Sequence, residues 1–92
     1  MSVRYTLTAT RQIDSALDYL STCSPEAARG LRDRILTVLA HLDAHPHIGH
    51  MTSLRHIRRF PLGSYPYLLD YSIDVDGITV RRFRHASRRP LA

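Results

Sequence analysis

The chain has 92 residues, which is enough for one modest hydrophobic core, so we expect a single domain over residues 1–92. Cys23 is the only cysteine, which excludes an intrachain disulfide, and we interpret its thiol as an inert, half-buried group in a helix connection. No segment is apolar over the length of a membrane span and the N-terminus lacks the apolar stretch of a signal peptide, so we expect a cytoplasmic protein without membrane contact.

The formal net charge of +5 is unevenly distributed, and all 13 cationic residues are arginine. Residues 1–50 hold five arginines against five acids, whereas residues 51–92 hold eight arginines against three acids. Such asymmetry favours a polyanionic partner or an acidic protein segment, with a merely solvated basic face as the alternative.

The first half of the chain reads as one strand and two helices. Apolar residues alternate with polar ones over residues 3–8, which predicts a strand, and Thr8 or Thr10 would then cap a helix. Ser24-Pro25-Glu26 predicts the start of a second helix, because a serine cap, a first-turn proline and a first-turn acid all suit a helix N-terminus. Its apolar stripe extends to about Ala44, so the two helices form a hairpin.

The second half reads as a loop followed by three strands. Residues 46–53 lack periodicity, and strands are predicted at Leu54–Phe60, Tyr65–Ile73 and Ile78–His85, separated by short turns. The predicted order β-α-α-β-β-β indicates an α+β fold, in which the helical hairpin packs on one side of a curved antiparallel sheet. The side chains expected to face the hairpin, with tyrosine hydroxyls at the rim of the core, are Tyr67, Leu69, Tyr71 and Ile73.

Five segments, in this order and spacing, resemble the ParE/RelE toxin superfamily of type II toxin–antitoxin systems: Ser24-Pro25-Glu26-Ala27-Ala28, His45-Pro46-His47-Ile48-Gly49, Ile57-Arg58-Arg59-Phe60, Tyr65-Pro66-Tyr67-Leu68-Leu69-Asp70-Tyr71 and Phe83-Arg84-His85-Ala86-Ser87-Arg88-Arg89-Pro90. The resemblance spans nearly the whole chain and implies the RelE/ParE toxin fold. It also implies growth arrest, plasmid stabilisation and a cognate antitoxin that forms a hetero-oligomer with the toxin.

The superfamily contains two activities. RelE-like members cut messenger RNA on the ribosome, whereas ParE-like members poison DNA gyrase without known chemistry of their own. RelE-like ribonucleases generally carry an arginine in the central strand just before its last tyrosine, and here the residues before Tyr71 offer no cation. The His85-Ala86-Ser87-Arg88 ending resembles ParE-like chains, so the resemblance favours a gyrase inhibitor.

The alternatives are a ribosome-dependent mRNA endonuclease and an inactive relative. A ribonuclease needs an acid–base pair and cations at the scissile phosphate, and the residues available for those roles are His85, Arg82, Arg84 and Arg88. For His85 the sequence favours a structural residue, hydrogen-bonded at the end of a strand, over a catalytic one. Under either activity the residues expected to bind the target or the antitoxin are Arg58, Arg59, Arg82, Arg84, His85, Arg88 and Arg89.

Strand alternation constrains which of these arginines share a surface. Arg58 and Arg59 are neighbours in one predicted strand, and Arg81 and Arg82 in another, so each pair is expected to point to opposite faces. The alternative interpretation of each of these arginines is a solvated charge at the sheet edge, which discourages pairing of that edge with a strand of another molecule.

Five of the six histidines lie between residues 41 and 56, and His41 and His45 have a spacing that can chelate a metal on a helix. No acid or cysteine accompanies them at a recognised metal spacing. We therefore expect no metal and no cofactor, and interpret the histidines as polar loop residues.

Overall fold

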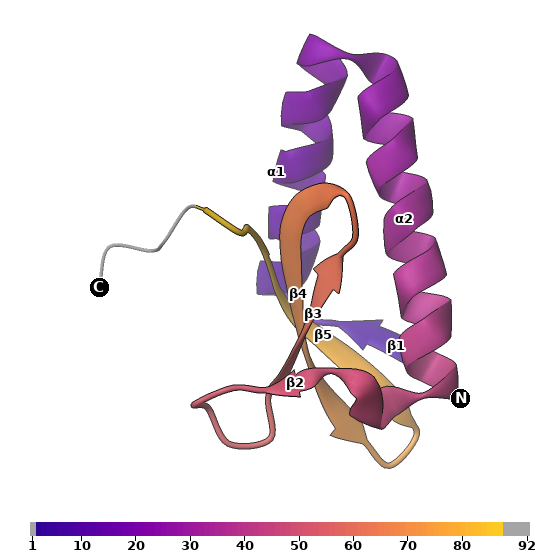
Figure 1. Cartoon of the computed structure of the whole chain (residues 1–92), viewed down its shortest axis with the longest axis vertical. Coiled ribbons are helices and arrows are strands. Elements are labelled where there is room, and N and C mark those ends of the chain that lie inside the picture. Colours follow the sequence, from indigo (N-terminus) through magenta and orange to yellow (C-terminus); the bar gives the residue numbers. More distant parts are fainter. Residues whose placement is uncertain (1, 88–92) are drawn as a thin grey trace.

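The computed structural model describes residues 2–87, in which a helical hairpin packs on a five-stranded sheet (Figure 1). The elements follow in the order β1 (Ser2–Tyr5), α1 (Leu7–Cys23), α2 (Pro25–Ala44), the 3-10 turn η1 (Pro46–Ile48), β2 (His50–Met51), β3 (Arg58–Leu62), β4 (Tyr65–Asp74) and β5 (Gly77–His85). This arrangement confirms the predicted α+β fold.

The sheet has the strand order β1-β5-β4-β3-β2. Strands β3, β4 and β5 form the predicted antiparallel meander. Strand β1 instead runs parallel to β5, with Ser2 opposite Gly77 and Tyr5 opposite Val80, so the sheet is mixed and not antiparallel throughout. A parallel pair needs a long crossover connection, and the segment between β1 and β5, including the hairpin, provides it.

The first strand is shorter than predicted because Thr6 ends it. The Oγ1 atom of Thr6 accepts a hydrogen bond of 3.1 Å from the backbone N–H of Ala9, so Thr6 caps α1, and not Thr8 or Thr10. The prediction of a strand over residues 3–8 was therefore wrong after Tyr5. Cys23 is the last residue of α1 and its side chain is exposed, not half-buried.

Helix α2 begins and ends where the sequence predicts. The Oγ atom of Ser24 accepts a hydrogen bond of 3.2 Å from the backbone N–H of Ala27, Pro25 lies in the first turn, and the helix ends at Ala44. Its apolar stripe supplies much of the buried core, namely Leu31, Ile35, Val38, Leu39 and Leu42. Local capping and the 3.6-residue period together fixed this element.

Strand β3 begins four residues later than predicted. The hydroxyl of Thr52 bonds to the backbone of Leu54 and Ile57, and these contacts hold residues 53–56 in a turn. The strand continues through Pro61, which was predicted to lie in a turn. Strand β2 pairs only with Arg58 and Arg59, so the missing N–H of Pro61 costs no hydrogen bond to β2. The predicted loop over residues 46–53 contains η1 and β2.

The face of β4 that packs on the hairpin differs from the prediction at Ile73, the last of the four predicted positions. Leu69 and Tyr71 are completely buried and Tyr67 is half-buried, but Ile73 is 37% exposed. The Tyr71 hydroxyl is not at the rim of the core. It donates a 2.6 Å hydrogen bond to the carbonyl of Pro46 and accepts one of 3.0 Å from the N–H of Gly49, so it ties η1 to the sheet.

Candidate functional site

A β-bulge in β5 brings two arginines onto one face of the sheet. Asp70 pairs with Arg82, but the next residue of β4, Tyr71, pairs with Val80, which leaves Arg81 as an extra residue. Val80 and Phe83 are both buried in the core beneath the helices. The two residues between them therefore both project from the opposite face, and the prediction that Arg81 and Arg82 point to opposite faces was wrong.

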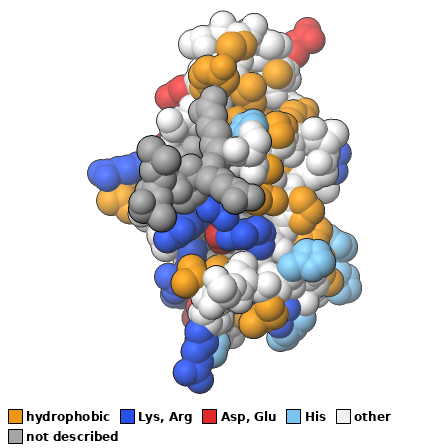
Figure 2. Space-filling view, turned by 60° about the vertical axis from the view of Figure 1, so that its left-hand side comes forward, with side chains coloured by type: hydrophobic (Ala, Val, Ile, Leu, Met, Phe, Trp, Pro, Cys, Tyr) orange, Lys and Arg blue, Asp and Glu red, His pale blue; other side chains and the backbone are white. Residues whose placement is uncertain are grey.

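We call the surface formed by Arg59, Arg81, Arg82 and Arg84 the arginine face. It lies on the side of the sheet opposite the helical hairpin, because Arg59, Asp70 and Arg82 are cross-strand neighbours on β3, β4 and β5. Figure 2 shows arginine side chains close together in the middle of the view, with an acidic side chain among them.

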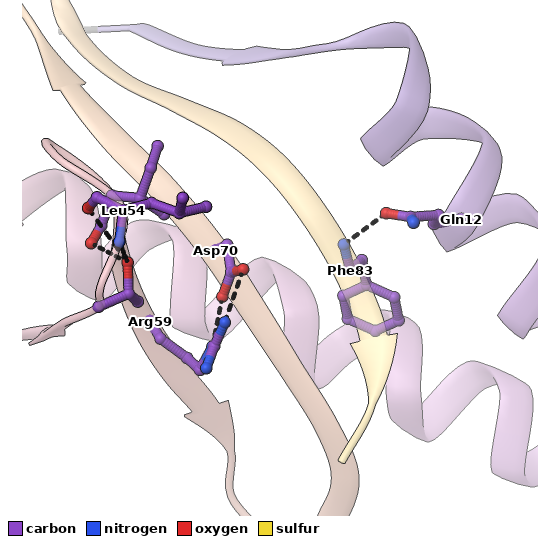
Figure 3. A network of polar contacts seen from close by, with 7 residues as sticks. Gln12, Leu54, Arg59, Asp70 and Phe83 are labelled. Atoms are coloured by element: carbon purple, nitrogen blue, oxygen red, sulfur yellow. Dashed lines mark hydrogen bonds and ion pairs between the residues drawn. The ribbon is translucent and has the colours of Figure 1, made fainter. Parts of the chain in front are cut away.

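The acidic member of this face is Asp70, which is 1% exposed and paired with Arg59 (Figure 3). The Nε atom of Arg59 lies 2.7 Å from one carboxylate oxygen of Asp70, and its Nη2 atom lies 3.1 Å from the other. This two-point hydrogen bond raises the pKa of Arg59 above its ordinary value, against the opposing effect of burial. The Arg59 charge is thus committed to a structural pair.

Arg81 and Arg82 remain directed toward solvent. The Nε atom of Arg81 donates a 2.8 Å hydrogen bond to the Ser72 hydroxyl, which orients the side chain, and its terminal nitrogens have no partner among residues 2–87. Arg82 forms no side-chain hydrogen bond or ion pair within residues 2–87. Two hollows, of about 530 and 300 Å³, adjoin here, and both are lined by Leu54 and Arg82.

Arg58 does not belong to the arginine face. It lies opposite Tyr71 and donates hydrogen bonds of 3.0 and 2.9 Å to the carbonyl oxygens of His47 and Gly49. Arg58 and Arg59 therefore point to opposite faces, as strand alternation predicts. Burial of Tyr71 raises the pKa of its hydroxyl, although the Gly49 N–H and the Arg58 charge act in the other direction.

His85 lies near the end of β5, beside Tyr67. Their ring centroids are 5.3 Å apart, edge to face, and the Nδ1 atom of His85 lies 2.8 Å from the Ser87 hydroxyl. Alternation along regular strand directs the side chains of His85 and Arg84 to opposite faces, which separates the imidazole from Arg82. Arg84 and His85 nevertheless both border one hollow on the helix side. Arg88 and Arg89 lie outside the described residues.

A further hollow, of about 590 Å³, lies on the helix side, and it was not predicted from the sequence. It runs between the helical hairpin and the end of the β4–β5 ribbon, and its apolar lining includes Tyr19, Leu20, Ala27, Tyr65, Tyr67 and Phe83. Tyr67 stacks on Phe83 with ring centroids 5.0 Å apart. The tyrosines of β4 are the sequence signal for this hollow, but in the sequence their alternation favours core packing over the alternative of stacking on bases.

The histidine-rich segment shows no metal-binding geometry in the part of the chain that the structure describes. The rings of His41 and His45 lie 5.4 Å apart, edge to face, and no group of three or more histidine, cysteine or acidic side chains is placed to hold an ion within residues 2–87. The same residues contain no helix that is both long and apolar enough to cross a membrane.

Comparison with known proteins identifies the family. The family model described as the ParE toxin of the type II toxin–antitoxin system parDE matches residues 3–90. The chain belongs to the ParE toxin family. A Sinorhizobium fredii protein named "Putative toxin Y4kP" is 32% identical to this ParE-family chain over 80 residues, which cover 85% of the chain and 83% of that protein.

A solved structure supports the fold independently. The chain superposes with a TM-score of 0.79 on a chain from the chromosomal ParDE toxin–antitoxin system of P. aeruginosa, with coverage of 95% and 97% of the two chains and 21% sequence identity. The chain described here is thus a type II toxin with the ParE architecture.

Proposed function

We propose that this ParE-family toxin inhibits DNA gyrase by binding, in the cytoplasm and without chemistry of its own, and that a cognate antitoxin neutralises it. The observation that carries the proposal is Asp70. RelE-like ribonucleases, which this fold resembles, generally have an arginine just before the last tyrosine of the central strand. Here that position holds a buried carboxylate that neutralises Arg59.

The placement of His85 supports the same proposal. General acid–base cleavage requires the proton-transfer group and the phosphate-binding cations to reach the same phosphodiester. His85 contacts Tyr67 on the helix side, whereas Arg82 projects from the arginine face; of these two arginines, Arg84 borders the same hollow as His85. A toxin with this arrangement is better suited to trapping a target than to cutting a strand.

The apolar hollow beside the helical hairpin supports a protein partner for neutralisation. Its aromatic and aliphatic lining suits the apolar face of an antitoxin segment, since amphipathic helices dock in apolar grooves. By family resemblance the antitoxin wraps the hairpin and sheet. A hetero-oligomer of toxin and antitoxin follows from this proposal.

A supercoiling assay with purified toxin and gyrase tests the proposal directly. We expect loss of supercoiling and an accumulation of linear DNA after denaturation of stalled cleavage complexes, and we expect an excess of antitoxin to reverse both effects. Gyrase that remains fully active at excess toxin would contradict the proposal. Primer extension on messenger RNA after toxin induction should show no codon-positioned cuts.

The role of His85 separates a binder from a ribonuclease. We expect His85→Ala to remain toxic, because the histidine does not act on a bond under the proposed function. Ser87→Ala is the matched control, since it removes the same side-chain contact and keeps the imidazole. Toxicity abolished by His85→Ala but retained by Ser87→Ala, with both proteins folded, would favour the ribonuclease.

A further inference from the structure

The arginine face combines exposed arginines with hydroxyl groups, and the carboxylate between them is already paired. Asp70, the cross-strand neighbour of Arg82, has both carboxylate oxygens hydrogen-bonded to Arg59, and Asp74, farther along the same face of β4, accepts a hydrogen bond from Thr79. Arg81 and Arg82 are exposed neighbours because of the bulge, and Arg84 follows on the same face. Three positive charges thus gather over one short segment of β5, which generates a strong local attraction for an anion.

Each of the two hollows at this face places hydroxyl side chains beside an arginine. Thr8 lines the hollow that contains Arg81 and Arg82, and Ser53 lines the hollow that contains Arg82 and Arg59. Thr6 and Thr52 line the same two hollows, but their hydroxyls already donate to backbone carbonyls. Arginine together with serine and threonine is the donor set that proteins use for phosphate oxygens of nucleic acid. Arg82 lines both hollows, so a chain of phosphates is able to cross from one to the other.

The lining also indicates which form of nucleic acid fits. Proteins that hold single strands stack the bases on aromatic rings. Within residues 2–87, no phenylalanine or tyrosine lines either hollow, and the tyrosines of β4 that share a hollow lie on the helix side instead. The arginine face therefore suits a duplex, whose bases remain paired and whose phosphates face outward.

A peptide is a poorer occupant of this face. Peptides commonly add a strand to an open sheet edge or insert apolar side chains into a groove. The edge of β5 beside the arginines is already in use, because the carbonyl of Arg81 accepts a hydrogen bond from Thr6 and the N–H of Phe83 donates one of 2.8 Å to Gln12. The extended aromatic groove is on the other side of the sheet.

We propose that the arginine face binds the phosphate backbone of duplex DNA through Arg81 and Arg82, without reading base sequence. This binding goes beyond the proposed inhibition of gyrase, because it requires only the toxin and DNA. A toxin that held DNA in this way would be able to contact the DNA of a gyrase complex as well as the enzyme. The two proposals fail separately, since DNA binding is measured without gyrase.

Fluorescence anisotropy of a labelled 20-base-pair duplex, titrated with the full-length toxin at several salt concentrations, tests the proposal. The variant Arg81→Gln/Arg82→Gln should weaken binding roughly tenfold or more at low salt and lower the slope of log affinity against log salt by about 2. Scrambling the duplex sequence should change the affinity little. The matched control is Arg29→Gln/Arg32→Gln, which removes the same charge from exposed positions of α2.

Equal loss of affinity in the two double variants would overturn the proposal, because net charge and not the arginine face would then explain binding. Binding of a poly-glutamate peptide with no binding of the duplex would overturn it in favour of an acidic protein partner. Circular dichroism checks that each variant is folded. If the double variant does not fold, the single variant Arg82→Gln replaces it in the titration, because Arg82 makes no side-chain hydrogen bond within residues 2–87. This substitution should lower the slope of log affinity against log salt by about 1.

Discussion

At the scale of single residues, two buried polar side chains on β4 make the contacts that organise the two faces of the sheet. Asp70 neutralises Arg59 and is itself almost completely buried. Tyr71, next in the chain, points to the other face and holds η1 against the sheet. Neither role is visible in the residue type alone, because an aspartate or a tyrosine in a strand is more often exposed at a surface or a rim.

Tyr71→Phe should destabilise the fold and alter its response to alkaline pH. The change leaves the buried N–H of Gly49 and the carbonyl of Pro46 without their partner, at a cost of about 1–3 kcal/mol in the free energy of unfolding. Chemical unfolding monitored by circular dichroism at neutral pH measures this cost. An unchanged free energy of unfolding would show that water replaces the hydroxyl.

The pH dependence follows from the raised pKa of Tyr71. Below about pH 10 the tyrosine is protonated in both states, so its contribution to stability is fully present. Above that pH the unfolded chain loses the proton first, so the native protein should lose stability as the pH rises toward the raised pKa. The Phe variant should lose less over the same range, and parallel losses in the two proteins would contradict this account.

At the scale of secondary-structure elements, local signals predicted the helices better than the strands. The boundaries of α2 follow from a cap, a proline and an apolar stripe that all lie within the element itself. Strand β3 begins late because the Thr52 side chain reorganises the preceding residues, and the bulge in β5 reverses the alternation that the sequence implied for Arg82. Bulges depend on the pairing of two strands, so counting residues along one strand does not reveal them.

Ser24→Ala tests the capping of α2. Removal of the hydroxyl leaves the N–H of Ala27 unsatisfied at the start of the helix, and we expect a loss of about 1 kcal/mol in the free energy of unfolding. Ser21→Ala is the matched control, because its hydroxyl only bonds back to the carbonyl of Asp18 in exposed helix, where alanine is at least as favourable. Urea unfolding of both variants measures the difference, and equal stabilities would exclude a capping role.

At the scale of the whole molecule, the N-terminal strand β1 forms one edge of the sheet and covers the edge of the C-terminal strand β5. Residues of β1 pair with those of β5 more than 70 positions later, and Val3 packs against the core that α2 and β5 form. The sheet also separates two surfaces of different chemistry, with the apolar hollow on the helix side and the arginine face on the other. A protein partner and a polyanion would therefore meet different faces.

A chain that begins at Thr6 tests how much β1 contributes to stability and to solubility. Deletion of β1 uncovers the edge of β5 and part of the core, so we expect a lower urea midpoint and self-association. Size-exclusion chromatography and urea unfolding measure both effects. Arg4→Gln is the control, because it removes only an exposed 3.3 Å ion pair with Asp76, and a truncated chain that matched its stability would contradict the role assigned to β1.

The sequence by itself determined the order of the elements other than η1 and β2, together with the limits of α2, the antiparallel meander and the concentration of arginine in the second half. Caps, periodicity, turns and charge are local properties. Only the tertiary structure decided that β1 runs parallel to β5, that Asp70 takes the charge of Arg59, and that Arg81 and Arg82 share one face while His85 turns to the other. These outcomes depend on pairing between segments distant in the chain. Strand register converts a basic composition into a defined surface, and composition alone does not specify register.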